Sequence, residues 1–420
     1  MSIRETLVVT ITGELKSAES YTLRDFLQRS GYPFEWIEVA SDEEARRLAG
    51  VDSLDDPRLP VCKISDHEVL YRPSIQELAK ALDWFSGPKL AEYDLAIYGA
   101  GPAGLSAAVY GASEGLTTVL IERSAVGGQA GTTSRIENYL GFPNGISGAE
   151  LAGRAREQAV RLGAEILIAD ECVAGAIESG KTVGYLSDGA KIVSRASICA
   201  TGIEYHRLGL AGEEHLLGRG LYYGAGSSEA RLCRGHVFVV GGGNSAGQAA
   251  INFAKNAEQV TMLIRGESLK ATLSQYLIDR IARTKNIEVC PRCTVTELHG
   301  GRSLEGITYY DANSGRDTRA ATGWLFVCIG GSPRTDWNKQ NVLLKDEAGY
   351  LLTGNDFVRD GKSMTPWPLP RLPYSMETSI PGVFAAGDVR HNSIKRCATA
   401  VGDGATAVAV VHRYLADGSA

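Results

Sequence analysis

Two glycine-rich turns, each placed between a strand-like run and a helix-like run, constrain the fold of this chain more than any other feature. In a turn of this kind the first glycine makes the turn, the second lets the backbone approach a pyrophosphate, and the third packs the helix on the strand. The helix start adds NH groups and positive potential. The positions are Gly99, Gly101 and Gly104 after "YDLAIY", and Gly241, Gly243 and Ala246 after "HVFVV". We therefore expect two α/β units that bind two dinucleotides, a flavin and a nicotinamide.

The residues that end the following strands indicate which nucleotide each unit prefers. Glu122 ends the strand after the first turn and can accept hydrogen bonds from ribose hydroxyls. Arg265 ends the strand after the second turn, and Lys270 lies close behind it. Cations at this place suit the 2′-phosphate of NADPH, whereas NADH needs an acid there, and Glu267 lies two residues beyond the strand end. We predict NADPH, and NADH stays open because Lys is a point charge and not a bidentate fork.

Length, charge and cysteine usage limit the class of protein. The 420 residues suffice for two or three domains with full cores. The net charge of -6 argues against a nucleic-acid binder, which needs a basic face. No apolar run approaches the roughly 18 residues of a membrane span, and the N-terminus lacks the features of a signal peptide. Most cysteines are scattered without framework spacing. We expect a cytoplasmic protein in a reducing compartment.

Residues 1–89 form a small α/β segment ahead of the first glycine turn. The predicted order is strand, helix, strand, helix, two strands and a helix, with Pro60 just before the third strand. This order resembles the thioredoxin/glutaredoxin fold. In that family a redox cysteine pair lies between the first strand and the next helix, and the matching stretch here, Ser17 to Ser20, holds no cysteine. The resemblance implies a thioredoxin-like domain that is redox-inactive.

Several motifs connect the two glycine turns. "GGQAG" and "IENYLGFP" follow the first turn, "ATG" stands at 200–202, "IGGSPRT" at 329–335, and "GVFAAGDVRHNSIKRCATAVGDGA" near the C-terminus. Together with the turns they resemble the thioredoxin reductase family of flavoproteins over about residues 93–420. The resemblance implies an α/β fold with two Rossmann-like domains. It divides the chain into an FAD-binding domain in two parts, 90–207 and 332–420, and an NAD(P)H-binding domain at 208–331, and it implies a homodimer.

The resemblance also implies the residues that bind the cofactors. Asp388 would bind the ribityl or phosphate region of FAD, and the helix after Arg396 would aim NH groups at the flavin edge that becomes anionic on reduction. The implied FAD-binding residues are Gly99, Gly101, Pro102, Ala103, Gly104, Glu122, Arg123, Gly128, Gln129, Asn138, Thr201, Gly202, Gly387, Asp388, Lys395, Arg396 and Cys397. The implied NADPH-binding residues are Gly241, Gly243, Asn244, Ser245, Ala246, Arg265, Lys270 and Gly330.

The chain departs from the family at the redox dithiol. That family carries a Cys-x-x-Cys pair followed by an acid shortly before the second glycine turn. Alignment from that turn places Ala225 and Ser228 where the cysteines belong, and Glu229 where the acid belongs. Serine forms no disulfide, and its hydroxyl does not ionise to a nucleophile as a cysteine thiol does. The flavin is therefore expected to pass no electrons to a protein disulfide at this place.

One Cys-x-x-Cys pair does occur, at Cys290 and Cys293 in "IEVCPRCTVTELHG". The stretch predicts strand, turn and strand, whereas an activated thiol usually lies at a helix N-terminus beside positive charge. Arg292 between the cysteines favours a thiolate somewhat. The pair is interpreted as structural thiols, as a regulatory disulfide or as a catalytic relay. No metal site is predicted, because zinc would need two more ligands and none stand nearby.

Four side chains are candidates for a catalytic role. Ser228, Glu229 and His391 are candidates for proton supply. Cys397 falls, by the resemblance, at the position whose backbone NH meets the pyrimidine edge of the flavin. Its thiol acts beside the ring or is a small side chain packed under the cofactor, and both interpretations stay open.

These features favour an FAD-dependent NAD(P)H oxidoreductase. Hydride would pass from nicotinamide C4 to flavin N5, and electrons would then go directly to an acceptor that is a small molecule, a small disulfide or a redox protein. Two alternatives stay open: a thioredoxin-disulfide reductase that uses Cys290 and Cys293, and a flavin-based redox sensor or adaptor. The Pro-rich segment 350–378 is interpreted as a rigid lid, a docking surface or a plain loop.

Overall fold

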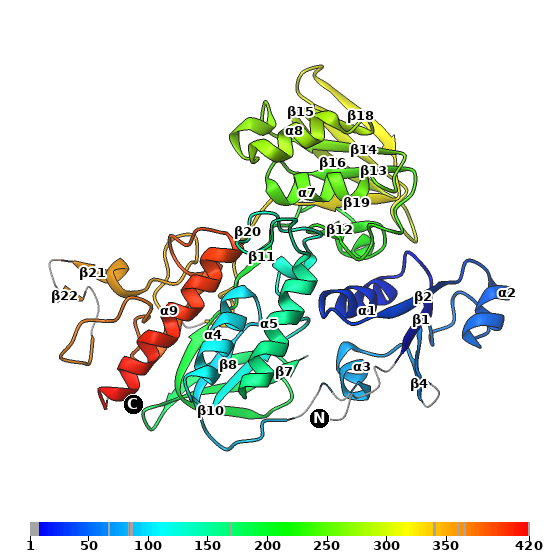
Figure 1. Cartoon of the computed structure of the whole chain (residues 1–420). Coiled ribbons are helices and arrows are strands. Elements are labelled where there is room, and N and C mark those ends of the chain that lie inside the picture. Colours follow the sequence, from blue (N-terminus) through cyan, green and yellow to red (C-terminus); the bar gives the residue numbers. More distant parts are fainter. Residues whose placement is uncertain are drawn as a thin grey trace. The chain divides into compact units, whose positions relative to one another are not determined.

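The computed structural model describes residues 8–65, 68–82, 84, 87–168, 170–338, 342–359, 362–363 and 367–418. The chain forms two compact units (Figure 1). Unit 1 comprises residues 1–78, 132–136 and 205–330, and unit 2 comprises residues 79–131, 137–204 and 331–420. These units group residues 1–78 with the second glycine turn and residues 79–89 with the first. The division of the chain into an N-terminal domain at 1–89, a two-part FAD-binding domain and an NAD(P)H-binding domain stays a prediction.

Unit 1 begins with a four-stranded sheet in the order β2-β1-β3-β4. β1 pairs in parallel with β2 and antiparallel with β3, and β3 pairs antiparallel with β4. The crossover that a parallel pair requires is the helix α1. The strands are β1 (Val9–Gly13), β2 (Phe34–Glu38), β3 (Val61–Ile64) and β4 (Glu68–Tyr71). We call residues 8–78 the N-terminal domain.

The helices of this domain have capped N-termini. At the start of α1 the Ser17 hydroxyl accepts a hydrogen bond from the Ser20 amide at 3.2 Å, and Leu23, Phe26 and Leu27 of the helix are buried. The second predicted helix is shorter than expected and continues as a π-helical turn that ends at a left-handed glycine. The helices are α1 (Ala18–Arg29), α2 (Asp42–Glu44), the π-helical turn η1 (Ala45–Ala49) and α3 (Ile75–Ala81).

The second glycine turn belongs to a parallel five-stranded sheet in unit 1, in the order β12-β19-β13-β14-β15. Its strands are β12 (Leu221–Tyr223), β13 (His236–Val240), β14 (Gln259–Ile264), β15 (Ile287–Pro291) and β19 (Trp324–Val327). The middle strands are apolar on both faces, as a covered parallel sheet requires. α7 (Asn244–Phe253) contacts β13 and β14, and α8 (Gln275–Arg283) packs on α7. We call residues 205–330 the nicotinamide domain.

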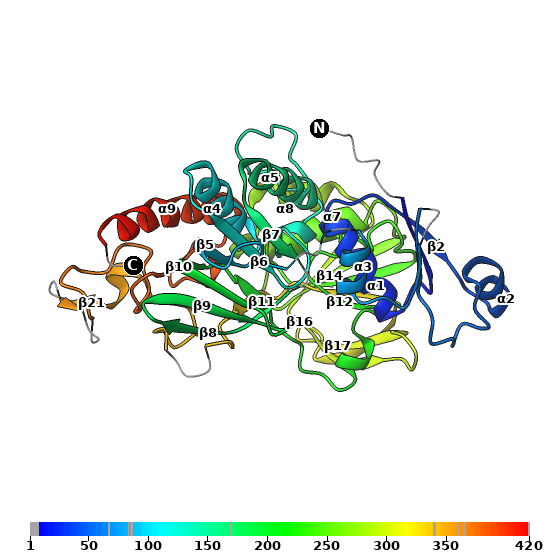
Figure 2. The same cartoon turned by 90° about the horizontal axis from the view of Figure 1, so that it is seen from below.

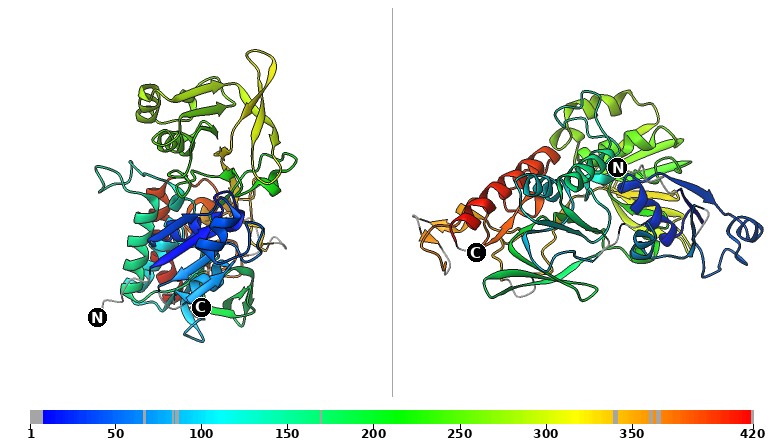
Figure 3. Two further views of the ribbon diagram at one scale, coloured as in Figure 1. Left: turned by 90° about the vertical axis from the view of Figure 1, so that its right-hand side faces the viewer. Right: turned by 60° about the horizontal axis from the view of Figure 1, so that its bottom comes forward.

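An antiparallel sheet completes this domain. β16 (Cys293–His299), β17 (Gly306–Asp311) and β18 (Arg316–Ala321) pair in that order and form the long twisted ribbon drawn in yellow in Figure 3. The short helix α6 (Glu213–Leu216) precedes β12, and a 3₁₀ turn, η3 (Leu269–Ala271), follows β14. β15 and β16 are consecutive in the chain but belong to different sheets, and are not the hairpin expected from the sequence.

Unit 2 is built on a seven-stranded sheet in the order β7-β6-β5-β10-β9-β8, with β23 beside β10. β5, β6, β7, β10 and β23 are parallel neighbours, whereas β8 and β9 form an antiparallel edge. The strands are β5 (Tyr93–Tyr98), β6 (Thr118–Glu122), β7 (Glu165–Ile168), β8 (Cys172–Glu178), β9 (Lys181–Leu186), β10 (Lys191–Cys199) and β23 (Val383–Ala385). The C-terminal stretch thus returns to the sheet started by residues 93–199.

Three long helices cover this sheet. α4 (Pro102–Ser113) lies between α5 (Gly148–Leu162) and α9 (Cys397–Ala416) in both Figure 1 and Figure 2. α4 contacts both neighbours, and small residues permit the close approach: a Cβ on Gly404 of α9 would lie 2.1 Å from the Ala103 carbonyl oxygen. No helix among the described residues is both long and apolar enough to cross a membrane.

The remaining elements of unit 2 are short. β11 (Ile203–Tyr205) and β20 (Gly331–Pro333) pair where the chain passes between the units, and β21 (Val358–Arg359) pairs with β22 (Lys362–Ser363). Three 3₁₀ turns are η2 (Ala130–Thr132), η4 (Gly354–Phe357) and η5 (Gly387–Val389). In the Pro-rich segment Arg371 makes a two-pronged ion pair with the buried Glu377, at 2.7 and 3.0 Å. This end of the segment is therefore fixed, while part of it lies outside the described residues.

Candidate functional site

The first glycine turn forms a tight cradle at the start of α4. Gly99 has a φ of +106°, and a Cβ on Gly104 would lie 1.8 Å from the Gly99 carbonyl oxygen. A Cβ on Gly101 would meet nothing within 4 Å, so the turn is open on that side. Gly128 has a φ of +54°, and a Cβ there would lie 3.1 Å from the Gly101 Cα. The open side is the place where a phosphate can reach backbone NH groups.

Glu122 ends β6 beside this cradle and is nearly buried. One of its carboxylate oxygens accepts a hydrogen bond from the Ala100 amide at 2.8 Å, and the other accepts one from the Ser124 amide at 2.9 Å. The second oxygen also accepts a hydrogen bond from the Ser124 hydroxyl at 3.2 Å, whereas the first keeps a lone pair for a ribose hydroxyl. Arg123, the next residue, pairs with Glu204 at 3.7 Å. The carboxylate is therefore fixed at the nucleotide edge of the sheet by two amides.

The C-terminal motif brings Asp388 to the same end of α4. A Cβ on Gly387 would lie 2.8 Å from the Ala103 side chain, so these two segments touch. The Asp388 Oδ1 atom is buried and accepts no hydrogen bond from the described residues. Burial, with a smaller contribution from Asp403, raises the pKa of Asp388 to about 6, although Lys395 opposes the shift. A buried carboxylate oxygen without a donor needs a polar partner, and a hydroxyl of a bound nucleotide is such a partner.

Other residues predicted to hold FAD lie in unit 2 as well. The Gln129 side chain donates to the Ile203 carbonyl at 2.7 Å, and the Thr201 hydroxyl donates to the Arg334 carbonyl at 2.8 Å. The ammonium group of Lys395 lies 4.5 Å from the centre of the Tyr350 ring. Asn138 and Arg396 are exposed, and Pro102, Gly202 and Cys397 stand at or beside helix and strand ends. Gln129 and Thr201 thus fix the backbone around the cradle.

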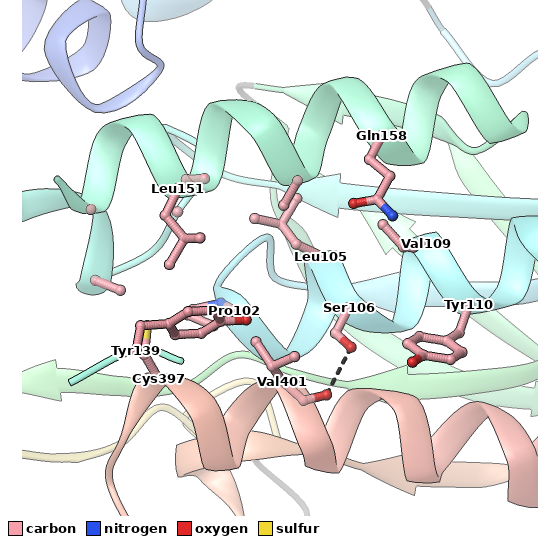
Figure 4. Close-up of a pocket in the computed structure, with 15 residues that line it drawn as sticks. Pro102, Leu105, Ser106, Val109, Tyr110, Tyr139, Leu151, Gln158, Cys397 and Val401 are labelled. Carbon is pink, nitrogen blue, oxygen red and sulfur yellow. Dashed lines mark hydrogen bonds between the residues drawn. The ribbon is translucent and has the colours of Figure 1, made fainter. Parts of the chain in front are cut away.

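A small pocket lies between α4, α5 and α9 (Figure 4). Its lining includes Leu105, Val109 and Leu151, and Figure 4 shows Tyr139 beside Pro102 at its end near Cys397. The Ser106 hydroxyl donates to the Val401 carbonyl at 2.7 Å and ties α4 to α9. The cavity volume of about 170 Å³ is below the ~300 Å³ at which small-molecule pockets begin, so this pocket alone does not hold a flavin.

The second glycine turn repeats the cradle in the nicotinamide domain. Gly241 has a φ of +134°, and a Cβ there would lie 2.2 Å from the Cys328 carbonyl oxygen, whereas a Cβ on Gly243 would meet nothing within 4 Å. α7 starts at Asn244, Ser245 is exposed, and Ala246 is buried against the strand. The amide side chain of Asn244 makes two hydrogen bonds with Ser274, at 3.0 and 2.9 Å. Asn244 therefore fixes the loop beyond α7, and its role in binding the nucleotide stays a prediction.

Cations surround the strand end next to this second cradle. Arg265 and Lys270 are exposed beyond β14, as predicted for a 2′-phosphate. Glu267, the acid nearby, forms an ion pair with Arg292, whose amide also donates to the Gly266 carbonyl. Because the charge of Arg292 offsets that of the Glu267 carboxylate, Glu267 is not an argument for NADH over NADPH. Sequence reasoning did not place Arg292 at this edge, because it is distant in sequence, and its charge is balanced by Glu267. Gly330, with a φ of +83°, follows β19 on the same domain.

Every residue predicted for FAD thus lies in unit 2, and every residue predicted for NADPH lies in unit 1. A model of the pyridine nucleotide-disulphide oxidoreductase family matches residues 93–404, which includes both cradles. The chain belongs to this family. Residues 1–92 lie outside the match.

Several relatives with substantial sequence identity are named thioredoxin reductases. Those of Listeria monocytogenes and Bacillus subtilis are each 34% identical over 325 residues, which is 77% of this chain and 94% and 95% of theirs. The structure is similar to the crystal structures of Lactococcus lactis thioredoxin reductase, with 29% identity and a TM-score of 0.68, and T. acidophilum thioredoxin reductase, with 28% and 0.67. Each match covers 77% of this chain and 99% of the other. As a member of this family the chain is an NAD(P)H-dependent oxidoreductase with FAD and NADPH as cofactors.

The candidate catalytic residues of this oxidoreductase do not form one cluster. Ser228 and Glu229 lie in unit 1, and His391 and Cys397 lie in unit 2. Glu229 is fully buried in an ion pair with Arg24, with a shortest distance of 3.0 Å. Burial raises the pKa of Glu229, although Arg24 opposes the shift. A buried carboxylate that is already paired cannot exchange a proton with a substrate, so proton supply by Glu229 does not fit this geometry.

The other candidates have fixed partners. The Ser228 hydroxyl is 3.5 Å from Asp25 of α1. The Nδ1 atom of His391 lies 2.6 Å from an oxygen of Asp346. Burial raises the pKa of Asp346, but the hydrogen bonds from His391 and from backbone amides outweigh it and lower the pKa overall. Cys397 begins α9, and burial, with the charge of Asp388, raises the pKa of its thiol to about 11. The Cys397 thiol is therefore protonated at neutral pH.

The two cysteines of the Cys-x-x-Cys pair lie in different sheets. Cys290 lies near the end of β15, the edge strand of the parallel sheet, and Cys293 is the first residue of β16 in the antiparallel ribbon. Arg292 between them has a φ of +58°. Both thiols are free. Burial and the nearby carboxylate of Glu288 raise the pKa of Cys290 to about 11, and burial and Asp311 raise that of Cys293. The expectation that Arg292 favours a thiolate is wrong, because Arg292 pairs with Glu267 instead. Among the described residues no cluster of His, Cys, Asp and Glu could hold a metal ion.

Proposed function

We propose that this oxidoreductase passes electrons from NADPH through FAD directly to an acceptor, with no dithiol of its own in between. The balanced reaction is NADPH, a proton and an oxidised acceptor giving NADP⁺ and an acceptor reduced by two electrons. The observation that carries the proposal is the chemistry at Ala225, Ser228 and Glu229. There the family's dithiol is replaced by groups that form no disulfide, and Glu229 is tied into a buried ion pair.

The chain's own residues suit this task. The open sides of the Gly101 and Gly243 turns would hold the pyrophosphates, and Asp388 would accept a hydrogen bond from a hydroxyl of the flavin nucleotide. The long helix α9 begins at Cys397 without a side-chain cap, so its first NH groups supply positive potential there. A flavin held there would supply the two-electron chemistry that links the nicotinamide to the acceptor. No acid–base residue is needed for hydride transfer itself.

The acceptor belongs to one of three classes: a small molecule, a small disulfide or a redox protein. The thioredoxin-disulfide reductase alternative requires Cys290 and Cys293 to work as a pair. Their raised pKa values and their places in two different sheets oppose that role. We also propose that the N-terminal domain, which falls within the predicted segment 1–89, is thioredoxin-like and has no redox function. The support is the β2-β1-β3-β4 order and the stretch Ser17–Ser20, which holds no cysteine at the start of α1.

An anaerobic titration with NADPH tests the proposal. Full bleaching of the flavin band at about one NADPH per FAD is expected, because the flavin is then the sole two-electron store. The C290S/C293S variant should give the same stoichiometry and unchanged turnover with a dye acceptor. About two NADPH per FAD in the parent, falling to about one in the variant, would show that a protein dithiol takes part and would overturn the proposal.

A further inference from the structure

The N-terminal domain and the nicotinamide domain lie in one compact unit. The surface between them involves Tyr222 and, in loop 224–233, Ser228 and Glu229. We infer that α1 of the N-terminal domain is a permanent internal occupant of this surface and closes it to any protein electron acceptor. The inference deepens the proposed function and rests on it, because it restricts where the acceptor can reach the enzyme. Apolar packing, a buried ion pair and close backbone approaches support it.

The apolar contacts join two cores into one. Leu15 and Tyr21 pack against the buried cluster of the nicotinamide domain. The Tyr21 ring meets the Tyr222 ring edge-on with centroids 4.8 Å apart, and Tyr222 stacks on Phe326 at 5.0 Å. Tyr222 and Phe326 are fully buried. Without the N-terminal domain the Tyr222 ring would lose its cover, so the interface resembles a domain core and not a transient contact.

The second support is the buried pair of Arg24 and Glu229. Arg24 Nε donates at 3.3 Å to one carboxylate oxygen of Glu229, and Nη2 donates to the two oxygens at 3.2 and 3.0 Å. The side chains are 1% and 0% exposed. Arg24 also donates to the Leu15 carbonyl at 3.1 Å, and its guanidinium lies 4.1 Å from the centre of the Trp36 ring. Each charge is stable in this place only while the other is present.

Glycines and rim charges show how closely the two domains meet. A Cβ on Gly218 would lie 2.9 Å from the Ala18 Cα, and a Cβ on Gly323 would lie 2.0 Å from the Lys16 ammonium nitrogen. At the rim, Arg302 bridges two acids of the N-terminal domain, Glu14 at 2.7 Å and Asp55 at 2.8 Å. A buried centre with charged groups at its rim is the anatomy of a stable interface.

The covered loop lies at the ligand edge of the parallel sheet. It begins where β12 ends, and Gly241 and Gly330 follow the ends of the parallel strands β13 and β19 on the same edge. Nucleotides bind at this edge in α/β sheets. A protein acceptor that needs this loop would have to displace α1, including the Arg24 and Glu229 pair. The acceptor must therefore take electrons at a place that does not involve loop 224–233.

Cutting the chain after the N-terminal domain tests whether α1 stays on the surface of the nicotinamide domain. A protease site inserted after Gly87, which is exposed and has free space around it, would be cleaved in the FAD-loaded full chain. At about 1 μM the N-terminal fragment should co-elute with the remainder in gel filtration. R24M should weaken this retention by about a hundredfold or more, because Glu229 keeps an unpaired charge, and R24M/E229Q should recover part of the loss. Release of the wild-type fragment would overturn the inference.

Two control variants separate this interface from other contacts. R72M breaks the exposed Arg72–Glu19 pair within the N-terminal domain, and R156L removes the guanidinium 5.2 Å from the Trp84 ring; both should retain the fragment. Retention that is lost in R156L but kept in R24M would also refute the inference. Where R24M does not fold, hydrogen exchange of uncut E229Q replaces it. Loop 224–233 should exchange at least about tenfold faster than in the parent, and an unchanged rate would refute the inference.

Failure of this inference is distinguishable from failure of the proposed function. A fragment that separates while NADPH still bleaches the flavin at about one equivalent refutes the internal occupant alone. If the fragment is retained but about two equivalents of NADPH are needed to bleach the flavin, only the proposal of direct electron transfer is refuted.

Discussion

At the residue scale, the cofactor sites depend on a few positions where a side chain is either impossible or required. Gly104 has no room for a Cβ, whereas Gly101 has room on the side that faces a ligand. Asp388 is the opposite case, since its buried Oδ1 atom needs a partner that the described residues do not provide. The glycines were predictable from their spacing. The state of Asp388 was not, because burial depends on how Gly387 meets α4.

Two alanine variants separate folding from cofactor binding. G104A should destabilise the protein and abolish FAD binding, because its Cβ would lie 1.8 Å from the Gly99 carbonyl oxygen. G101A should leave the free energy of unfolding within about 1 kcal/mol of the parent, since φ is -71° and the space is open. Its FAD affinity should fall by about tenfold or more, because the methyl group occupies the phosphate approach. Flavin-to-protein ratios and thermal unfolding measure both effects. Full FAD content in G101A would contradict the assignment of the cradle.

Asp388 predicts a pH dependence of stability in protein stripped of FAD. Burial raises its pKa from 3.8 to about 6 in the folded state. Between these values the folded protein binds more protons than the unfolded chain, so the free energy of unfolding falls as the pH rises. The loss due to this group should be about 2 to 3 kcal/mol by pH 7. D388N should remove this part of the slope in urea unfolding measured from pH 4 to 7. An equal slope in D388N and the parent would contradict the predicted pKa.

At the element scale, the fold decides which strands that are neighbours in the sequence belong to the same sheet. β15 and β16 are consecutive, yet one ends a parallel sheet and the other begins an antiparallel ribbon. The sequence predicted strand, turn and strand there, but a strand pattern does not say with which strand it pairs. The Cys290 and Cys293 pair was therefore open until their sheets were known. In the same way, the sequence did not show that Glu377 in the Pro-rich segment is buried beneath Arg371, and the role of this segment stays a prediction.

The Arg371–Glu377 pair should make residues 367–378 a fixed part of unit 2. Glu377 is 0% exposed and Arg371 is 20% exposed, and the guanidinium also lies 3.9 Å from the centre of the Tyr374 ring. R371M leaves a buried carboxylate unpaired, so the free energy of unfolding should fall by about 3 kcal/mol. The control R154M, which breaks the exposed Arg154–Glu150 pair on α5, should change it by less than about 1 kcal/mol. Equal stabilities of the two variants in denaturant unfolding would contradict a structural role for Arg371.

At the scale of the whole molecule, unit 2 is assembled from stretches that are far apart in the chain. Its nucleotide site combines the turn at 99–104, Gly128 and the motif at 387–388, all within unit 2. A ligand that binds such a site stabilises the folded state over the unfolded state. The homodimer and the cytoplasmic location stay predictions, as neither is tested by a single chain.

Removal of FAD should therefore lower the stability of unit 2. At free FAD about 1,000 times the dissociation constant, binding should add about 4 kcal/mol to the free energy of unfolding, and the unfolding temperature should rise with FAD concentration. Riboflavin, which lacks the pyrophosphate that the Gly101 turn receives, should stabilise the protein far less. Thermal unfolding at several concentrations of each compound measures this. Equal stabilisation by riboflavin and FAD would argue against the cradle at 99–104.

The sequence by itself determined the two nucleotide-binding units, the parallel strands around them and the absence of cysteine at 225–228, because these depend on local spacing and on residue identity. Only the tertiary structure decided what Glu229 does. In the sequence it is an acid beside this cysteine-free stretch, and in the fold it is the partner of Arg24, 205 residues earlier. Ion pairs and burial depend on which surfaces meet, and no local pattern encodes the meeting of α1 with loop 224–233.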